Sequence, residues 1–324
     1  MKPIFALIFA AALLFPALVS AQDAAASYPS RAVHLIVPFP PGGGVDVIGR
    51  TLAQQLAVKF GQTFIVDNRP GASGNIGVRA AIAAQPDGYT LLLFATVVGM
   101  YPLIHSNLEY DPFTDLAPIA TVATQPLALF ATSELPVQSV ADLIRLAREA
   151  PGKYAFAGVA VGSPQHMAGE LLMNRTGIRA THVPYKGTAP AVTDLISGQT
   201  QFAFLGLSSG LPFVKSGKLK VLAVAAPKRS ELGPDIATME ESGVADFDLG
   251  ITYFVAAPPA TPSAILKRLN DEIAAILKQP AVIDTLQKLG YEVTFGAADV
   301  VTGKLRDENR KWAPIVKAAG IKAQ

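Results

Sequence analysis

The residues best suited to chemistry are three consecutive glycines, Gly42, Gly43 and Gly44, which follow the run Pro38-Phe39-Pro40-Pro41. Glycine has no Cβ, so the backbone N–H groups of such a run can approach a bound group closely. The first N–H groups of a helix have no partner within it, and the helix dipole favours negative charge at that end. The run therefore predicts a site for an anion such as a carboxylate or a phosphate. The alternative is an ordinary Gly/Pro turn.

The flanking residues indicate which elements hold this run. Apolar residues alternate over residues 33–37, as in a strand, and recur every four residues over residues 48–56, as on one face of a helix. The glycines thus connect a strand to a helix. They match no common phosphate motif, because no Lys follows them as in a P-loop, and Val47 stands where a dinucleotide-binding run has its last glycine.

Two later loops repeat the arrangement of a strand, a glycine-containing loop and a helix. Residues 158–162 precede Ser163, which is placed to cap a helix or to offer a hydroxyl to a ligand. Residues 183–190 contain Tyr185, Lys186 and Gly187. Loops of this kind in both halves of the chain would let two sheets present helix N-termini to one small anion.

Candidate enzyme sites are incomplete. The run Gly206–Gly210 fits the G-x-S-x-G elbow with Ser208 as nucleophile, but that hydrolase fold requires a later histidine, and all four histidines precede Ser208. His166 and Glu170 are four residues apart, as metal ligands can be, but no third ligand is evident, which favours a surface or capping pair. The sequence therefore predicts no catalytic residue, no metal and no cofactor.

Composition excludes further classes of protein. The chain has 324 residues, no cysteine and a formal net charge of +2, without a block of basic residues. The absence of cysteine removes thiol nucleophiles, thiolate metal sites and disulfides. The charge distribution argues against nucleic acid as a partner.

The N-terminal residues indicate secretion. Lys2 precedes an apolar stretch to Phe15, and Val19-Ser20-Ala21 supplies the small residues of a cleavage site before Gln22. We expect residues 1–21 to be removed as a signal peptide. The alternative, an uncleaved anchor, is disfavoured because the apolar stretch is short for a span.

Short apolar strands alternate with amphipathic helices, which predicts an α/β fold with mostly parallel sheets. The length suits two domains. Strands are expected at residues 63–67, 90–94, 127–131, 154–157, 180–183, 201–205, 219–225 and 251–257, and helices at 140–149, 262–278 and 298–319. We expect Thr261 to cap the second helix, with Pro262 at its first position, and Pro314 to kink or divide the last.

An ordered set of short motifs resembles the extracytoplasmic solute-binding proteins of the tripartite tricarboxylate transporter system, the Bug family. The matching runs are Tyr28-Pro29-Ser30-Arg31, Val37–Gly44, Asp67-Asn68-Arg69-Pro70-Gly71-Ala72, Gly74-Asn75-Ile76-Gly77, Pro86–Leu92, Tyr110-Asp111-Pro112, Gly162-Ser163-Pro164 and His182–Gly187. They extend from the mature N-terminus to the end of the middle third of the chain.

The resemblance implies a two-domain Venus-flytrap fold of the type II periplasmic binding kind, with two crossing hinge strands near residues 120–130 and 220–226. The first domain would comprise residues 22–125 and 226–324, and the second residues 126–225. In that family the ligand, a carboxylate, lies between the domains and is held largely by loop backbone, hydroxyls and water. The positions expected at the ligand are Phe39, Gly42, Gly43, Gly44, Val45, Asp46, Thr96, Val97, Gly162, Ser163, Tyr185, Lys186, Gly187, Ala189, Leu205 and Gly206.

Four departures from the family pattern fall on these loops. Val45 replaces the usual Thr, residues 94–99 are more apolar than usual, the 158–162 turn is longer, and Leu205-Gly206 stands where many relatives have Asp-Asn. We expect a ligand less polar than a tricarboxylate, namely an aromatic or short aliphatic monocarboxylate.

The resemblance implies a monomeric periplasmic receptor that delivers its ligand to a membrane permease of the tripartite tricarboxylate type. The alternatives are a receptor for a sensor kinase without transport, and a secreted α/β hydrolase acting on carboxylate esters.

Overall fold

The structure is a computed structural model that describes residues 27–42 and 44–322. The predicted signal peptide and Gly43 lie outside the described residues. The chain divides into two compact units. The first comprises the described residues up to Phe94 together with Thr114–Ala120 and Val255–Lys278, and the second comprises Ala95–Phe113, Thr121–Phe254 and the described residues from Gln279 on. The predicted domain limits at residues 125 and 226 remain a proposal.

Eleven strands form two sheets in the described part of the chain. The six-stranded sheet has the order β11-β4-β10-β3-β1-β2, in which β1 runs parallel to both β2 and β3. Its strands are β1 (Val33–Val37), β2 (Phe64–Asn68), β3 (Thr90–Ala95), β4 (Ala117–Gln125), β10 (Ile251–Ala257) and β11 (Glu292–Ala297). β11 was not predicted from the sequence, and β4 was expected only as part of the hinge strand near residues 120–130.

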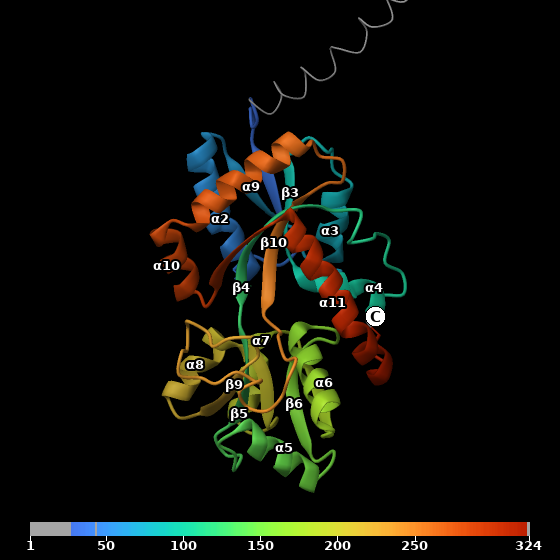
Figure 1. The fold of residues 1–324 in the computed structure, drawn as a ribbon, viewed down its shortest axis with the longest axis vertical. Helices are drawn as coiled ribbons and strands as arrows, with labels where there is room; N and C mark the ends of the chain where they lie inside the picture. The colour runs from blue at the N-terminus through green and yellow to red at the C-terminus, as the bar shows by residue number, and fades with distance from the viewer. Residues whose placement is uncertain (1–26, 43, 323–324) are drawn as a thin grey trace, which may run out of the picture. The chain divides into compact units, whose positions relative to one another are not determined.

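The five-stranded sheet has the order β7-β6-β8-β5-β9. β6 is parallel to β7 and β8, whereas β5 is antiparallel to β8 and β9. Its strands are β5 (Leu127–Thr132), β6 (Tyr154–Val159), β7 (Ala180–Tyr185), β8 (Phe202–Gly206) and β9 (Leu219–Val224). The alternation of strand and helix therefore continues through both sheets (Figure 1).

The chain changes sheet at two places. β4 ends at Gln125 and β5 begins at Leu127, so Pro126 alone separates the two sheets there, within the predicted hinge at 120–130. On the return, β9 stays in the five-stranded sheet to Val224, and the chain re-enters the six-stranded sheet at Ile251. The second change of sheet thus extends beyond the predicted 220–226 through an irregular segment.

Two of the helices begin at serines that the sequence offers as caps. The helices and 3-10 turns are α2 (Gly44–Phe60), η1 (Ala72–Gly74), α3 (Asn75–Ile82), η2 (Thr96–Met100), α4 (Tyr101–Ile104), α5 (Val140–Glu149), α6 (Pro164–Thr176), α7 (Thr188–Ile196), α8 (Leu207–Lys215), α9 (Ser263–Leu277), α10 (Pro280–Lys288) and α11 (Ala298–Ala319). Ser139 and Ser163 cap α5 and α6, because each hydroxyl accepts a hydrogen bond from the N–H three residues later.

Two predictions about helix ends were wrong. Thr261 does not cap α9, because its hydroxyl donates to the Pro258 carbonyl at 2.8 Å, and Pro262 rather than Thr261 occupies the N-cap position. α11 is not divided at Pro314, which lies inside one continuous helix. Proline removes one helical hydrogen bond. Burial of Trp312, Ile315 and Val316 on either side of it offsets that loss.

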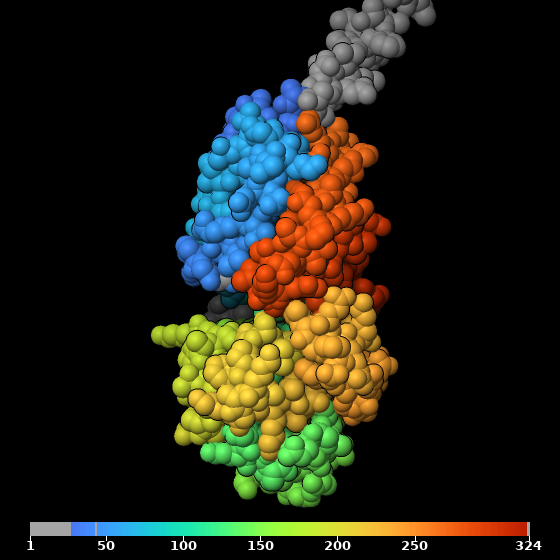
Figure 2. All heavy atoms as spheres, turned by 90° about the vertical axis from the view of Figure 1, so that its left-hand side faces the viewer, coloured from blue at the N-terminus to red at the C-terminus, as the bar shows by residue number. Residues whose placement is uncertain are grey.

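Within the first unit, α2 and α9 lie side by side, as the blue and orange surfaces in Figure 2 show. Lys59 and Glu272 join them by an ion pair at 3.4 Å. The predicted apolar face of α9, which includes Ile265, Leu269 and Ile273, is buried. No helix among the described residues has the length and apolar composition required to span a membrane.

Candidate functional site

The glycine loop is held by the side chain of Asp46, in the first turn of α2. One carboxylate oxygen of Asp46 accepts hydrogen bonds from the Gly42 N–H and the Arg50 Nε, each at 2.9 Å. The other accepts from Asn68 Nδ2 at 2.8 Å, and the same amide also donates to the Phe39 carbonyl at 3.0 Å. The end of β2 and the first turns of α2 are thereby tied to both sides of the loop.

Asp46 is 2% exposed, and burial alone would raise the pKa of its carboxyl. The hydrogen bonds from Arg50, Gly42 and Asn68, together with the charge of Arg50, outweigh burial and hold the pKa below its usual 3.8. Asp46 is therefore an anionic anchor whose oxygens face the protein's own donors. The sequence placed Asp46 at the ligand, whereas its side chain holds the loop and leaves the first N–H groups of α2 unpaired within the helix.

Close packing fixes the start of the same loop. Gly77 in α3 lies against it, since a Cβ there would be 2.5 Å from Pro38 Cβ and 3.0 Å from the Arg69 carbonyl oxygen. The rings of Phe39 and Phe94 stack with their centroids 5.7 Å apart. Phe39 thus presents a partly exposed ring directly before the glycines.

In the second unit, Gly162 and Ser163 form the turn before α6. The Gly162 N–H donates to His166 Nδ1 at 3.0 Å, and Ser163 Oγ accepts from the His166 N–H at 3.2 Å. His166 Nε2 lies 3.4 Å from Glu170 Oε1. His166 and Glu170 were interpreted as a surface or capping pair. The surface alternative was wrong, because the His166 side chain is 6% exposed. The contacts of His166 with Gly162 and Ser163 agree with the capping alternative.

A second histidine reinforces that support. The rings of His166 and His182 stack with centroids 3.9 Å apart, and Phe156 packs on both. Burial first, and then His166, lower the pKa of His182 to about 4, so His182 is neutral at neutral pH. No group of three or more possible metal ligands occurs within the described ranges.

The remaining predicted positions of this unit fall into two groups. Tyr185 and Leu205 are structural: the Tyr185 hydroxyl donates to Asp194 Oδ2 at 2.8 Å, and Leu205 is buried in the core beside β5. Burial, followed by Asp194, raises the pKa of Tyr185 to about 12. In contrast, Lys186 and Ala189 are exposed, and Gly187 is partly exposed at the start of α7.

Gly206 lies at the end of β8 against Gln125, a residue that the sequence analysis did not select. A Cβ at Gly206 would lie 2.6 Å from Gln125 Nε2. Gln125 ends β4 directly before the change of sheet at Pro126, so the only sequence signal for it was its place at a predicted hinge.

Thr96 and Val97 lie in η2, which packs against α11. Gly99 permits this approach, because a Cβ there would lie 2.2 Å from the Leu305 carbonyl oxygen, and Asn309 Nδ2 donates to the Gly99 carbonyl at 3.1 Å. Thr96 is buried, whereas Val97 is partly exposed. The C-terminal helix therefore positions the third predicted loop.

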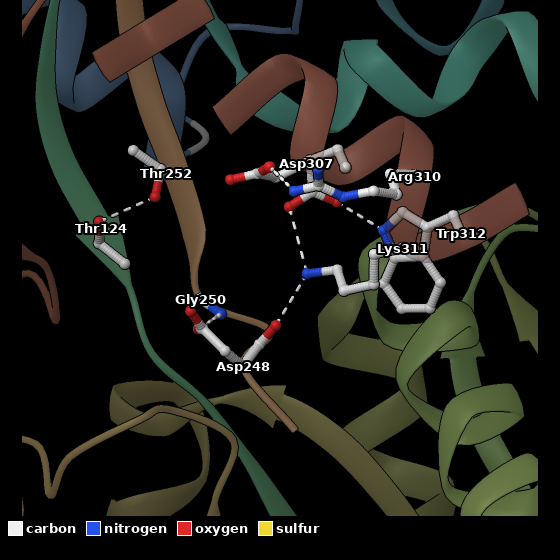
Figure 3. Close-up of polar contacts among 9 residues, drawn as sticks. Thr124, Asp248, Gly250, Thr252, Asp307, Arg310, Lys311 and Trp312 are labelled. Carbon is white, nitrogen blue, oxygen red and sulfur yellow. Dashed lines mark hydrogen bonds and ion pairs between the residues drawn. The ribbon is translucent and has the colours of Figure 1, made fainter. Parts of the chain in front are cut away.

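A polar cavity of about 240 Å³ adjoins Thr96. Hydroxyls of Thr124, Thr252 and Thr294 are joined by hydrogen bonds of 3.0–3.1 Å along its wall. Lys311 Nζ donates to the Asp248 carbonyl at 2.8 Å and approaches Glu308, to which Trp312 also donates (Figure 3). These contacts fasten α11 to the segment that precedes β10.

The sequence matches the model of the tripartite tricarboxylate transporter family receptor over residues 48–321. It is 36% identical to protein BugT of Bordetella pertussis over 308 residues, which cover 94% of each chain. The match extends through the last third, where the sequence motifs were least distinctive.

Solved structures of similar proteins agree with this match. Rpa4515 of Rhodopseudomonas palustris, determined with adipate, has a TM-score of 0.80 and 35% identity, and covers 91% of this chain and 99% of its own. MatC from the same organism, with bound malate, has a TM-score of 0.77 and 28% identity over 89% of this chain and 100% of its own. The periplasmic binding protein BugD has a TM-score of 0.77 and 32% identity over 92% and 100%. The predicted two-domain periplasmic binding fold is confirmed.

Proposed function

Since this chain belongs to the family of tripartite tricarboxylate transporter receptors, we propose that it binds a small carboxylate in the periplasm and delivers it to a membrane permease of that system. The family consists of solute-binding receptors, so the chain is a receptor rather than an enzyme, and the hydrolase alternative is set aside. Binding adipate and malate is a property of the two relatives, and it supports a carboxylate as the ligand here.

The observation that carries the proposal is the hydrogen bond by which Asp46, in the first turn of α2, holds Gly42. The Asp46 carboxylate accepts from the Gly42 N–H and from the Asn68 side chain. The N–H groups of the first turn of α2 have no partner within the helix. A carboxylate there would gain hydrogen bonds and the favourable end of the helix dipole. We retain the prediction that loops of both units contribute, with Ser163, Gly187 and Lys186 as the donors of the second.

We further propose that the ligand is less polar than citrate. Phe39 and Val97 are partly exposed, and Val161 in the turn before Ser163 is 43% exposed, so apolar side chains accompany the donors in each predicted loop. Leu205 and Gly206 supply no side-chain hydrogen-bonding group. A monocarboxylate with an aromatic or short aliphatic body satisfies these loops without leaving a polar group unpaired.

The periplasmic location and the monomeric state are part of the proposal, as is removal of residues 1–21. A receptor that serves a sensor protein instead of a permease would use the same binding chemistry. Uptake of the labelled ligand by cells with and without the receptor separates the two, because a receptor for a sensor alone leaves uptake unchanged.

The test is a thermal-shift screen of the mature chain against aromatic and aliphatic monocarboxylates, adipate, malate and citrate. A ligand that binds only the folded protein raises its melting temperature as its concentration exceeds the dissociation constant. We expect the largest shift with a monocarboxylate, and loss of that shift in Gly44→Val, whose side chain would block the first turn of α2. Gly303→Val is the matched control, since Gly303 is also helical and a Cβ there meets no atom within 4 Å.

A larger shift with citrate would overturn the monocarboxylate assignment. No shift with any acid would overturn the carboxylate proposal.

A further inference from the structure

A groove of about 850 Å³ in the second unit lies away from the predicted ligand loops. It is lined by α5, by the last residues of α6 and by the segment 242–246. Figure 1 shows α5 and α6, which form two of its walls. None of the residues predicted to bind ligand lines this groove.

Three arginines line the groove: Arg145, Arg148 and Arg175. Its apolar lining consists of Ala141, Ile144, Val244 and Ala245. An arginine offers up to five N–H donors in a planar fork that matches a carboxylate. The groove thus combines arginine N–H groups, which can donate to a carboxylate, with apolar surface.

The arginines are incompletely paired. Arg148 donates through Nε and Nη2 to one acceptor, the Thr176 carbonyl at the end of α6, and has no carboxylate partner among the described residues. Arg175 reaches Asp246 only at 3.5 Å, and the Asp246 side chain is 79% exposed. Arg145 has two carboxylate partners, Glu149 at 3.4 Å, which also lines the groove, and Asp142 at 3.5 Å. The Arg145 and Glu149 side chains are about 60% exposed. Exposed pairs of this kind are weak and are readily exchanged for another carboxylate.

We propose that this groove is a docking surface for an acidic, amphipathic segment of the membrane partner, whose carboxylates bind Arg148 and replace Asp246 on Arg175 while its apolar side chains cover Ile144 and Ala245. The inference rests on the proposed function, since a receptor that delivers a ligand must contact a partner. A small anion fits less well, because exposed side chains line the groove and would leave such a ligand largely in water.

The experiment measures binding of a fluorescein-labelled, 16-residue helical peptide of Leu and Glu to the mature chain by fluorescence anisotropy at low salt. A peptide with Lys in place of Glu is the control for sequence-independent adhesion. The test variant is Arg145→Glu/Arg175→Glu, which leaves the Arg148 bond to α6 intact. Lys267→Glu/Lys288→Glu is its matched control, because it reverses two exposed helical cations that are likewise paired with a carboxylate four residues away.

We expect the wild-type chain to bind the Glu peptide and not the Lys peptide, with the affinity reduced roughly tenfold in the Arg145/Arg175 variant and unchanged in the Lys267/Lys288 variant. Equal binding by the two variants, binding of the Lys peptide, or no binding of the Glu peptide to the wild type would overturn the proposal. Displacement of the peptide by millimolar succinate would also overturn it and assign the groove to a small acid.

Ligand-induced thermal shifts are measured on the same variants. A failure of the proposed function appears as the absence of any shift in the wild type. A failure of the docking proposal appears in peptide binding, with the shifts intact.

Discussion

Replacing Asp46 by Ala removes the carboxylate that ties β2, the glycine loop and α2 together. Two of its hydrogen bonds, from Gly42 N and Asn68 Nδ2, are partly buried. Hydrogen bonds to a charged group contribute about 1.5 kcal/mol each at the low end, so their loss is worth about 3 kcal/mol. Arg50 is left out of this sum because its side chain is 54% exposed and water replaces the carboxylate.

A loss of this size lowers the melting temperature by about 6–12 °C for a chain of this class. Ligand affinity should fall as well, because the loop must be ordered again on binding. Ordering the backbone of one residue costs roughly 1–2 kcal/mol, so an affinity loss of about tenfold or more is expected. Asp46→Asn should give intermediate values, because its amide oxygen keeps one of the two bonds.

The assay is thermal unfolding with and without the best ligand of the screen, followed by calorimetric titration. Asp284→Ala is the control, since that exposed carboxylate on α10 pairs with Lys288 of the same helix and with no other cation among the described residues. Wild-type stability in Asp46→Ala would refute the anchor. Reduced stability with unchanged affinity would show that the loop contributes nothing to ligand binding.

Three further predictions concern the supports of the site. Gly77→Ala should be destabilising by about 1–3 kcal/mol, because the added Cβ meets the rigid backbone and ring of Pro38. Gly303→Ala should be neutral or slightly stabilising, and the denaturant midpoints of both variants test this. Tyr185→Phe should cost about 1 kcal/mol of stability through the lost hydrogen bond to Asp194, and it should leave ligand affinity within twofold. A large loss of affinity in titration would show that Tyr185 contacts the ligand. The pKa of His182 is about 4 in the folded chain against 6.5 unfolded, so the unfolded state takes up the proton first: the stability is intact above pH 6.5 and falls between pH 6.5 and 4. His182→Gln should flatten that part of the stability profile, and melting curves from pH 7.5 to 4 that match the wild type would contradict this.

Local signals in the sequence identified most of the elements around the site. The alternation at 33–37, the glycine run and the helical spacing after it predicted β1, the loop and α2 where they occur. Ser139 and Ser163 predicted the starts of α5 and α6, because a capping hydroxyl acts on an N–H only three residues away. The motif order predicted the family.

The errors arose where distant residues decide. The apolar pattern did not predict β11, and it did not predict β4 apart from the hinge that the resemblance implied, because polar threonines interrupt it. Thr121 and Thr124 of β4 form hydrogen bonds with Thr294 of β11. The burial of His166 was missed because its spacing from Glu170 gives no sign of it. His182, 16 residues later, stacks on the His166 ring. Leu205 belongs to the core of its own sheet, a fact that its motif position could not reveal.

The sequence by itself determined the class of fold, the glycine loop and the family, because periodicity, glycine content and motif order are properties of neighbouring residues. Only the tertiary structure decided what the polar side chains of the loop do. Asn68 is 22 residues from Asp46 and 18 from Arg50, and its hydrogen bonds to them exist only when β1 and β2 pair in register. That pairing turns Asp46 from an apparent ligand group into the anchor that holds the loop in place.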